Sequence, residues 1–191
     1  LGRQTRLGRR GPDGQVLRGL PARVLPLGVW HTASTGLDIW LSALCWGAAE
    51  VVVMLTGEEA PDYRTALQEQ VDLARAIWQG LGYSGAGVSL LEAAPTSAHA
   101  GLALPAAPSM HALVQVDKAL SQLAPPVGSA AAATAPAAAA SAFKPATFTV
   151  LPEKRATLEM CIDHLLSHSP IATQPAEQRP ESITLPGGQA F

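Results

Sequence analysis

Residues 23–83 have the sequence RVLPLGVWHTASTGLDIWLSALCWGAAEVVVMLTGEEAPDYRTALQEQVDLARAIWQGLGY. Short runs of β-branched and other apolar residues alternate in this stretch with longer segments whose apolar residues recur at helical spacing. Alternation of strand and helix with few residues between them is typical of a parallel α/β sheet. This stretch therefore decides the fold class.

The first half of the stretch predicts one strand and one helix. The strand is Val24–Val29, and Pro26 inside it favours a strand end or edge because proline has no backbone N–H to donate. Ser34 or Thr35 is expected to cap the helix, since a hydroxyl oxygen can accept from the first free N–H groups of a helix. Gly47 is the residue expected to end that helix.

The second half contains the strongest strand. In Glu50–Thr56 the continuous β-branched and apolar residues indicate burial on both faces, as in a parallel sheet with helices on either side. Pro61 is expected to open a helix lasting to Gln79, because proline is favoured at the first helical position. Gly87–Leu91 is the next predicted strand. The inner face of the helix is predicted to hold Leu67, Val71, Ala74 and Ile77 or Trp78.

The rest of the chain carries weaker signals. We expect a helix over Ser109–Leu123, a last strand at Ala146–Leu151 and a helix over Pro152–Ser167. Residues 124–142 are rich in alanine and proline. The prolines break any long helix there, which predicts a flexible, low-complexity insertion.

These elements predict the domain organisation. An α/β domain occupies residues 21–169 and contains the insertion. Its fold class is three-layer α/β, with a mostly parallel sheet of about four strands and a flavodoxin-like organisation. Residues 1–20 form a basic N-terminal segment that we interpret as truncated, and residues 170–191 form a proline-rich, linker-like tail.

Charge and hydropathy narrow the functional classes. The formal net charge is −2, so nothing global points to nucleic acid or an anionic membrane. The arginines of residues 1–20 could contact RNA or lipid, but we favour a solvated helix end because no aromatic residues are interleaved to stack on bases. The apolar stretch Leu37–Thr56 is too short to cross a membrane. Asp38 and Glu50 bracket only eleven residues of it, and a span needs about 20.

Cysteine usage bears on the cellular compartment. The chain has two cysteines, Cys45 and Cys161, and both stand in apolar helical surroundings. That pattern suits a reducing cytoplasm better than a disulfide-stabilised secreted scaffold. We therefore expect a cytoplasmic protein.

Two loops follow predicted strands, at the edge of the sheet where open α/β proteins bind ligands. The first spans residues 31–36 and the second residues 57–60. The candidate site residues are His31, Ser34, Gly36 and Asp38 in or after the first loop, and Gly57, Glu58, Glu59 and Tyr63 in or after the second.

The chemistry of these loops has two interpretations. The first loop leads into a helix N-terminus, where backbone N–H groups can hold an anion, although it lacks the spaced glycines and the lysine of a Walker loop. His31 beside Glu58 or Glu59 could form a proton-handling pair across the two loops. We favour the alternative, a hydrogen-bonded structural histidine with solvated carboxylates.

Metal and nucleophile motifs are weak elsewhere in the chain. His164 and His168 lie four residues apart on one helix face, which is a metal-ligand spacing. A third ligand is missing, and an HEXXH motif would need a glutamate where Leu165 stands. No GxSxG elbow exists and neither cysteine lies in a polar loop, so no serine or cysteine nucleophile is supported. We predict no metal site and no catalytic residue within this chain.

The central stretch also resembles a known protein family. The residues that carry the resemblance are LPARVLPLGVWHTASTGLDIWLSALCWGAAEVVVMLTGEEAPDYRTALQEQ (20–70) and IWQGLGY (77–83), and more loosely KRATLEM (154–160) and ITLPGGQAF (183–191). They resemble the central region of a proteobacterial family of multi-cluster 4Fe-4S ferredoxin-type proteins, in which the ferredoxin cysteine motifs lie outside this region. The order of elements is also similar to the delta subunit of methyl-viologen-reducing hydrogenases.

The resemblance implies an iron–sulfur electron-transfer parent protein. It implies that this chain is an internal piece, ending before a C-terminal ferredoxin module, with a redox partner of the dehydrogenase or hydrogenase type. The hydrogenase subunit has cysteines in the corresponding loops, whereas the loops here are HTAST and TGEEAPDY. A 4Fe-4S cluster takes four cysteine ligands and this chain has two, so we expect clusters in the parent and none bound by this segment.

Three functional hypotheses follow. The favoured one is a non-cluster scaffold or partner-docking region of a 4Fe-4S ferredoxin-type electron-transfer protein, which makes the chain an electron-transfer component rather than an enzyme. The alternative is a small-molecule or nucleotide-binding enzyme domain that uses the 31–36 and 57–60 loops. A purely structural interaction module is the third.

Overall fold

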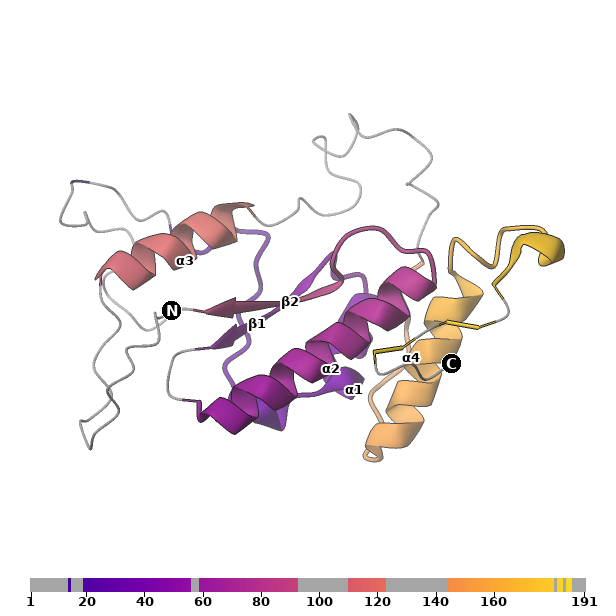
Figure 1. Cartoon of the computed structure of the whole chain (residues 1–191), viewed down its shortest axis with the longest axis horizontal. Helices are drawn as coiled ribbons and strands as arrows, with labels where there is room; N and C mark the ends of the chain where they lie inside the picture. The colour runs from indigo at the N-terminus through magenta and orange to yellow at the C-terminus, as the bar shows by residue number, and fades with distance from the viewer. Residues whose placement is uncertain are drawn as a thin grey trace.

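The computed structural model describes residue 14 and residues 19–55, 59–92, 110–122, 144–180, 182–183 and 185–186. Figure 1 shows how the elements in these ranges are arranged. In chain order they are η1 (Thr32–Ser34), α1 (Leu37–Cys45), β1 (Val51–Leu55), α2 (Pro61–Gly80), β2 (Val88–Glu92), α3 (Met110–Gln122), α4 (Lys154–Ser167) and η4 (Ala176–Gln178), where η denotes a 3-10 helix.

The strands β1 and β2 form a parallel pair. Their register runs from Val51 opposite Val88 to Leu55 opposite Glu92. Parallel strands need a crossover connection, and α2 supplies it with 20 residues. The strands predicted at 50–56 and 87–91 are confirmed as β1 and β2, with ends that differ slightly from the expected ones.

The helix α2 forms the main wall of the core. It begins at Pro61 and ends at Gly80, as its proline start and glycine-rich end predict. Every residue predicted for its inner face is buried, namely Leu67, Val71, Ala74, Ile77 and Trp78. Burying a leucine or valine side chain fully contributes about 1.5–3 kcal/mol, so this face fixes α2 against the sheet and α1.

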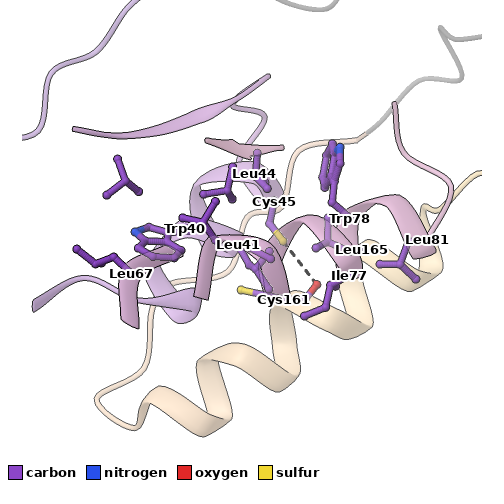
Figure 2. Close-up of a cluster of buried hydrophobic side chains, with 14 of the residues drawn as sticks. Trp40, Leu41, Leu44, Cys45, Leu67, Ile77, Trp78, Leu81, Cys161 and Leu165 are labelled. Atoms are coloured by element: carbon purple, nitrogen blue, oxygen red, sulfur yellow. Dashed lines mark hydrogen bonds between the residues drawn. The ribbon is translucent and has the colours of Figure 1, made fainter. Parts of the chain in front are cut away.

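The helices α1 and α4 pack against each other although they are far apart in the sequence. In the shared cluster, side chains of α1, α2 and α4 meet (Figure 2). The Cys45 thiol lies 3.5 Å from the carbonyl oxygen of Cys161, and the Ser42 hydroxyl lies 3.2 Å from the Cys161 sulfur. All three residues are fully buried, as is Leu165 on the next turn of α4.

The start of α1 differs from the prediction. Its N-cap residue is Gly36, which offers no side-chain cap. The hydroxyls of Ser34 and Thr35 donate instead to backbone carbonyls of the preceding η1 turn. The Thr35 hydroxyl also accepts from the Trp40 indole and so joins that turn to α1. The end of α1 is as predicted: Gly47 follows it with φ +101°, a left-handed conformation that glycine adopts without strain.

The predicted sheet of about four strands is wrong. Within the described ranges the sheet has two strands, β1 and β2. The three-layer, flavodoxin-like organisation is therefore not formed. What remains is a single strand–helix–strand unit (Figure 1). The helix α1 contacts α2 and α4, and α3 contacts β2.

The first missing strand is residues 24–29. This segment runs without a turn or bend but does not join the sheet. Its apolar side chains face solvent, with Leu25 94% and Leu27 75% exposed. The strand was predicted there from apolar content alone, and the segment does not pair with either β1 or β2.

The second missing strand is residues 146–151, whose backbone groups find partners outside any sheet. The Ala146 N–H donates to the Cys45 carbonyl at the end of α1, at 2.7 Å. The Phe148 carbonyl accepts from the Trp46 indole. The backbone of Leu151 bonds with the Thr157 hydroxyl in α4. Helix ends and side chains thus replace the expected neighbouring strand.

Other predicted segments are only partly described. The helices predicted at 109–123 and 152–167 are confirmed as α3 and α4. The expected insertion at 124–142 and most of the basic segment at 1–20 lie outside the described residues. Within the segment expected to be a linker-like tail, Ile183 and Leu185 pack against the core cluster.

A glycine next to β2 provides a test of this packing. Gly87 has φ +63°, and a Cβ added there would lie 2.7 Å from the Trp78 ring. Gly85 has φ +81° but open space around the same position. Gly85→Ala should cost about 1–2 kcal/mol of unfolding free energy from backbone strain alone. Gly87→Ala should cost about 1–3 kcal/mol more, because the ring must move.

Urea unfolding followed by circular dichroism measures both variants. Gly85→Ala is the matched control, since both positions have a left-handed backbone. Equal losses in the two variants would show that Trp78 does not press on this turn.

Candidate functional site

The two loops predicted to form a site come together in the structure. The first contains η1, which contacts β1. The second follows the carboxyl end of β1 and leads into α2. The Thr32 hydroxyl donates to the Glu59 carboxylate at 3.4 Å, and the rings of His31 and Tyr63 meet edge to face with centroids 5.2 Å apart. The loops are therefore neighbours, although the first of them does not follow a strand as the prediction assumed.

His31 has a local structural role in the first loop. Its Nδ1 accepts from the Ala33 N–H at 3.1 Å and so caps η1. Its carbonyl accepts from the Ser34 hydroxyl at 2.6 Å. Because Nδ1 is an acceptor here, the ring position left to face outward is Nε2.

Glu59, in the second loop, is a buried acidic residue. Only 9% of it is exposed, and Thr32 is its hydrogen-bond partner from the first loop. A hydrogen bond between the two loops therefore comes from Thr32, while the His31 ring contacts Tyr63. Gly57 and Glu58, the other candidate residues of the second loop, lie outside the described residues.

The N-terminus of α1 has oxygen atoms in front of it. A Cβ built on Gly36 would lie 3.2 Å from Oδ1 of Asp38 and 3.4 Å from Oε1 of Gln70. The carboxylate of Asp38 stands in the first helical turn, where the helix dipole favours negative charge. An anion at this position would meet that carboxylate, so the surroundings favour hydrogen-bond donors over a phosphate.

A cavity that the sequence did not indicate lies at the same end of the sheet. Its volume is about 340 Å³, and it is lined by Leu55, Arg64, Thr65, Gln68, Glu69, Leu90 and Glu92. Leu55 and Glu92 are the last residues of β1 and β2. Arg64 forms an ion pair with Glu92 at 3.0 Å. The ends of the two strands were predictable from the sequence. The ion pair between Arg64 and Glu92 was not, because no sequence pattern indicates it.

The two histidines of α4 lie side by side near its C-terminus. The ring centroids of His164 and His168 are 4.3 Å apart. One nitrogen of each already contacts a backbone carbonyl: His164 Nε2 that of Lys144 at 3.0 Å, and His168 Nδ1 that of His164 at 2.9 Å. No group of three or more metal-ligating side chains occurs in the part of the chain that the structure describes.

The cysteines do not fit an iron–sulfur cluster. Both are fully buried between α1 and α4, whereas a 4Fe-4S cluster needs four cysteine thiolates. The hydrogen bond with Cys161, followed by burial, raises the pKa of the Cys45 thiol. Tyr83 is also structural: burial and then the nearby Cys45 raise its pKa to about 12, and its hydroxyl donates to the Leu165 carbonyl.

The chain was compared with known proteins in three ways. A scan against protein-family models, a search of curated proteins and a search of solved structures each found no match to the chain. None of the helices in the described ranges is both long enough and apolar enough to cross a membrane.

The histidine pair predicts a pH dependence of stability. Burial, and then the neighbouring His168, lower the pKa of His164 from its ordinary value of 6.5, against a smaller opposite effect of the Lys144 carbonyl. The folded protein therefore binds fewer protons than the unfolded chain just below pH 6.5. The free energy of unfolding should fall as pH drops from 7.5 to 5.5, and be level above that range.

Chemical denaturation across that range measures the effect. His164→Gln should flatten the slope while keeping a donor for the Lys144 carbonyl, and His168→Gln should reduce it in part. Slopes that are identical in all three proteins would contradict this assignment.

The buried thiols predict slow labelling. Cys45 and Cys161 have no exposed surface, so a thiol reagent reaches them only when α1 and α4 separate. Ellman's reagent should leave the native protein unlabelled over minutes and label two thiols in denaturant. Rapid labelling of the native protein would show that these helices do not pack as described.

Proposed function

We propose that this chain is a partner-docking region, without clusters of its own, of a 4Fe-4S ferredoxin-type electron-transfer protein. The class of the parent rests on the sequence resemblance of residues 20–91 and 145–191. The docking role is carried by one observation: the two loops hold the exposed rings of His31 and Tyr63 together at the carboxyl end of the sheet.

The geometry suits contact with a protein surface. Tyr63 is 51% exposed, and its position on α2 is fixed by the buried face of that helix. Aromatic side chains held rigidly at a surface are enriched among residues that anchor protein interfaces. The bond between Thr32 and Glu59 holds the loop backbone beneath these rings, which lowers the entropy lost on binding.

The partner is a redox protein of the dehydrogenase or hydrogenase type, and the clusters belong to other parts of the parent. We assign the protein to the cytoplasm, because its two thiols are free and buried and a reducing compartment keeps them so. In this role the chain positions a partner and performs no reaction with its own side chains.

A small-molecule or nucleotide-binding enzyme domain is the second candidate. The observation that favours it is the cavity of about 340 Å³ at the ends of β1 and β2, which the first turns of α2 also line. Open α/β proteins bind ligands at this edge. Arg64 and Glu92 line the cavity, so its ligand would carry polar groups that engage both charges.

The genomic sequence around the coding segment is the first test. In-frame codons for a CxxCxxCxxxC motif after Phe191 are expected, because the proposal places the clusters outside this chain. In the full-length protein, His31→Ala and Tyr63→Ala should raise the KM for the redox partner several-fold and leave kcat and the cluster EPR spectrum unchanged.

The control variant is Leu166→Ala, at an exposed position on α4. A stop codon directly after Phe191 would overturn the ferredoxin assignment. Unchanged KM values for both loop variants would overturn the docking role. Saturable binding of flavin mononucleotide or ATP to the chain, lost in Arg64→Ala, would favour the enzyme.

A further inference from the structure

The two cysteines of the chain meet across the contact between α1 and α4. Cys45 is the last residue of α1, and Cys161 lies in the middle of α4. The Cys45 thiol is 3.5 Å from the Cys161 carbonyl oxygen, and the two thiols are hydrogen-bond partners. Figure 2 shows both among the buried side chains of these helices. The chain contains two cysteines in all, so a disulfide formed within one chain must join this pair.

Ser42 gives Cys161 a second polar neighbour. The serine hydroxyl donates to the Asp38 carbonyl at 2.6 Å, and its oxygen lies 3.2 Å from the Cys161 sulfur. A serine hydroxyl has one hydrogen. While that hydrogen is donated to Asp38, the Cys161 thiol is therefore the donor to the serine oxygen. The Cys161 proton thus has a polar oxygen to move toward inside a buried contact.

The surroundings select Cys161 as the thiol that ionises first. Cys45 stands at the C-terminal end of α1, where the helix dipole disfavours a negative charge. The hydrogen bond from the Cys45 thiol, opposed by burial and supported by Ser42, lowers the pKa of Cys161 to about 7. The same hydrogen bond raises the pKa of Cys45. Because the thiolate is the nucleophilic form of cysteine, Cys161 is suited to attack an oxidant.

We propose that Cys45 and Cys161 form a reversible redox switch, in which a peroxide closes a disulfide that locks α1 to α4 and a thiol reductant opens it. The switch acts within the core and does not use the rings of His31 and Tyr63. The inference is therefore independent of the electron-transfer role and of the docking partner.

The chemistry of closure balances with hydrogen peroxide as the oxidant. The Cys161 thiolate takes one oxygen atom to become a sulfenic acid, and the O–O bond breaks to release hydroxide, which takes up the proton that Cys161 lost. The Cys45 sulfur then attacks the sulfur of the sulfenic acid. The S–S bond forms, and the hydroxyl group leaves as water with the Cys45 proton. The two sulfurs lose two electrons, which reduce one peroxide molecule to two of water.

Burial makes this closure slow and selects a small oxidant. Neither cysteine has exposed surface, which excludes bulky reagents, whereas hydrogen peroxide is close to water in size. Cys45 is the last residue of its helix, and helix ends open more readily than helix interiors. The next residue, Trp46, is 44% exposed, so this end of α1 is at the surface. Once Cys161 is oxidised, Cys45 is beside it and the second step needs no further opening.

The disulfide closes a long loop across the core. The two residues are 116 positions apart, and a cross-link between distant residues removes more conformational freedom from the unfolded chain than one between near residues. The oxidised chain should therefore resist unfolding more strongly than the reduced chain.

Mass spectrometry of the whole chain tests the switch. The reduced protein is incubated for hours with hydrogen peroxide in slight molar excess and then denatured, and its free thiols are alkylated. The product should have lost the mass of two hydrogen atoms and take up no alkylating group. Proteolysis should yield one peptide pair linked through Cys45 and Cys161. Dithiothreitol should restore both thiols.

Cys45→Ala and Cys161→Ala are the matched controls, because each removes one sulfur and keeps the other. Neither variant can form a disulfide within one chain, so a remaining thiol that reacts should gain oxygen instead. Circular dichroism checks that both variants are folded. If one is not, the linked peptide pair of the unaltered chain still decides between a closed disulfide and two separate thiols.

Urea unfolding measures the lock itself. Oxidation should raise the urea midpoint by at least about 1 M, given the length of the closed loop, and dithiothreitol should return it to the reduced value. Peroxide should not raise the midpoint of either alanine variant. Thiols that stay reduced, thiols that gain oxygen without linking, or a disulfide between two copies of the chain would overturn the proposal. A linked chain whose midpoint does not rise would overturn it as well.

Discussion

The contact between α1 and α4 is the constraint on which the rest of the structure depends. It joins Cys45 and Cys161, which are 116 residues apart in the sequence. Both residues are fully buried, together with Leu41, Leu44 and Leu165 around them. Without α4, the face of α1 that carries these residues would be open to water, and α1 contacts both β1 and α2. A two-stranded parallel sheet is marginal alone, so the helical layer supplies most of the stability.

The locally encoded parts of this fold could be predicted from the sequence. Pro61 and the spacing of Leu67, Val71 and Ala74 place α2, because the start signal and the buried face both belong to one continuous segment. The size of the sheet could not be predicted in this way. An apolar run indicates that a segment prefers burial or strand pairing. It does not indicate with which groups the backbone of that segment will form hydrogen bonds. The N–H of Ala146 goes to the end of α1 instead of a neighbouring strand, and no local pattern contains that choice.

In the candidate site, too, the positions of the loops could be predicted from the sequence, but the contacts between distant residues could not. Residues 31–36 and 59–63 lie together as expected, but the prediction had assumed a strand before the first loop, which residues 24–29 do not form. The prediction also could not select the contacts within the site, where Thr32 bonds with Glu59 and His31 turns to Tyr63. The ion pair of Arg64 with Glu92 is a further case, since it joins the start of α2 to the end of β2.

The short sheet and the exposed apolar residues at 25–29 have one physical origin. A strand in a parallel sheet is stabilised by neighbours on both edges and by cover on both faces, and β1 has one strand neighbour within the described ranges. Residues 24–29 have the composition of a strand but Pro26 removes one donor, which makes them poor as a central strand and adequate at an edge. The chain therefore leaves the apolar side chains of residues 25–29 exposed at its surface. Natural edge strands are usually blocked by charge or by a covering element, whereas residues 25–30 contain neither Lys, Arg, Asp nor Glu. Because exposed backbone groups can bond with water, residues 25–29 stay outside the sheet without a partner strand, and the buried contacts of α1, α2 and α4 supply the stability that a larger sheet would have given.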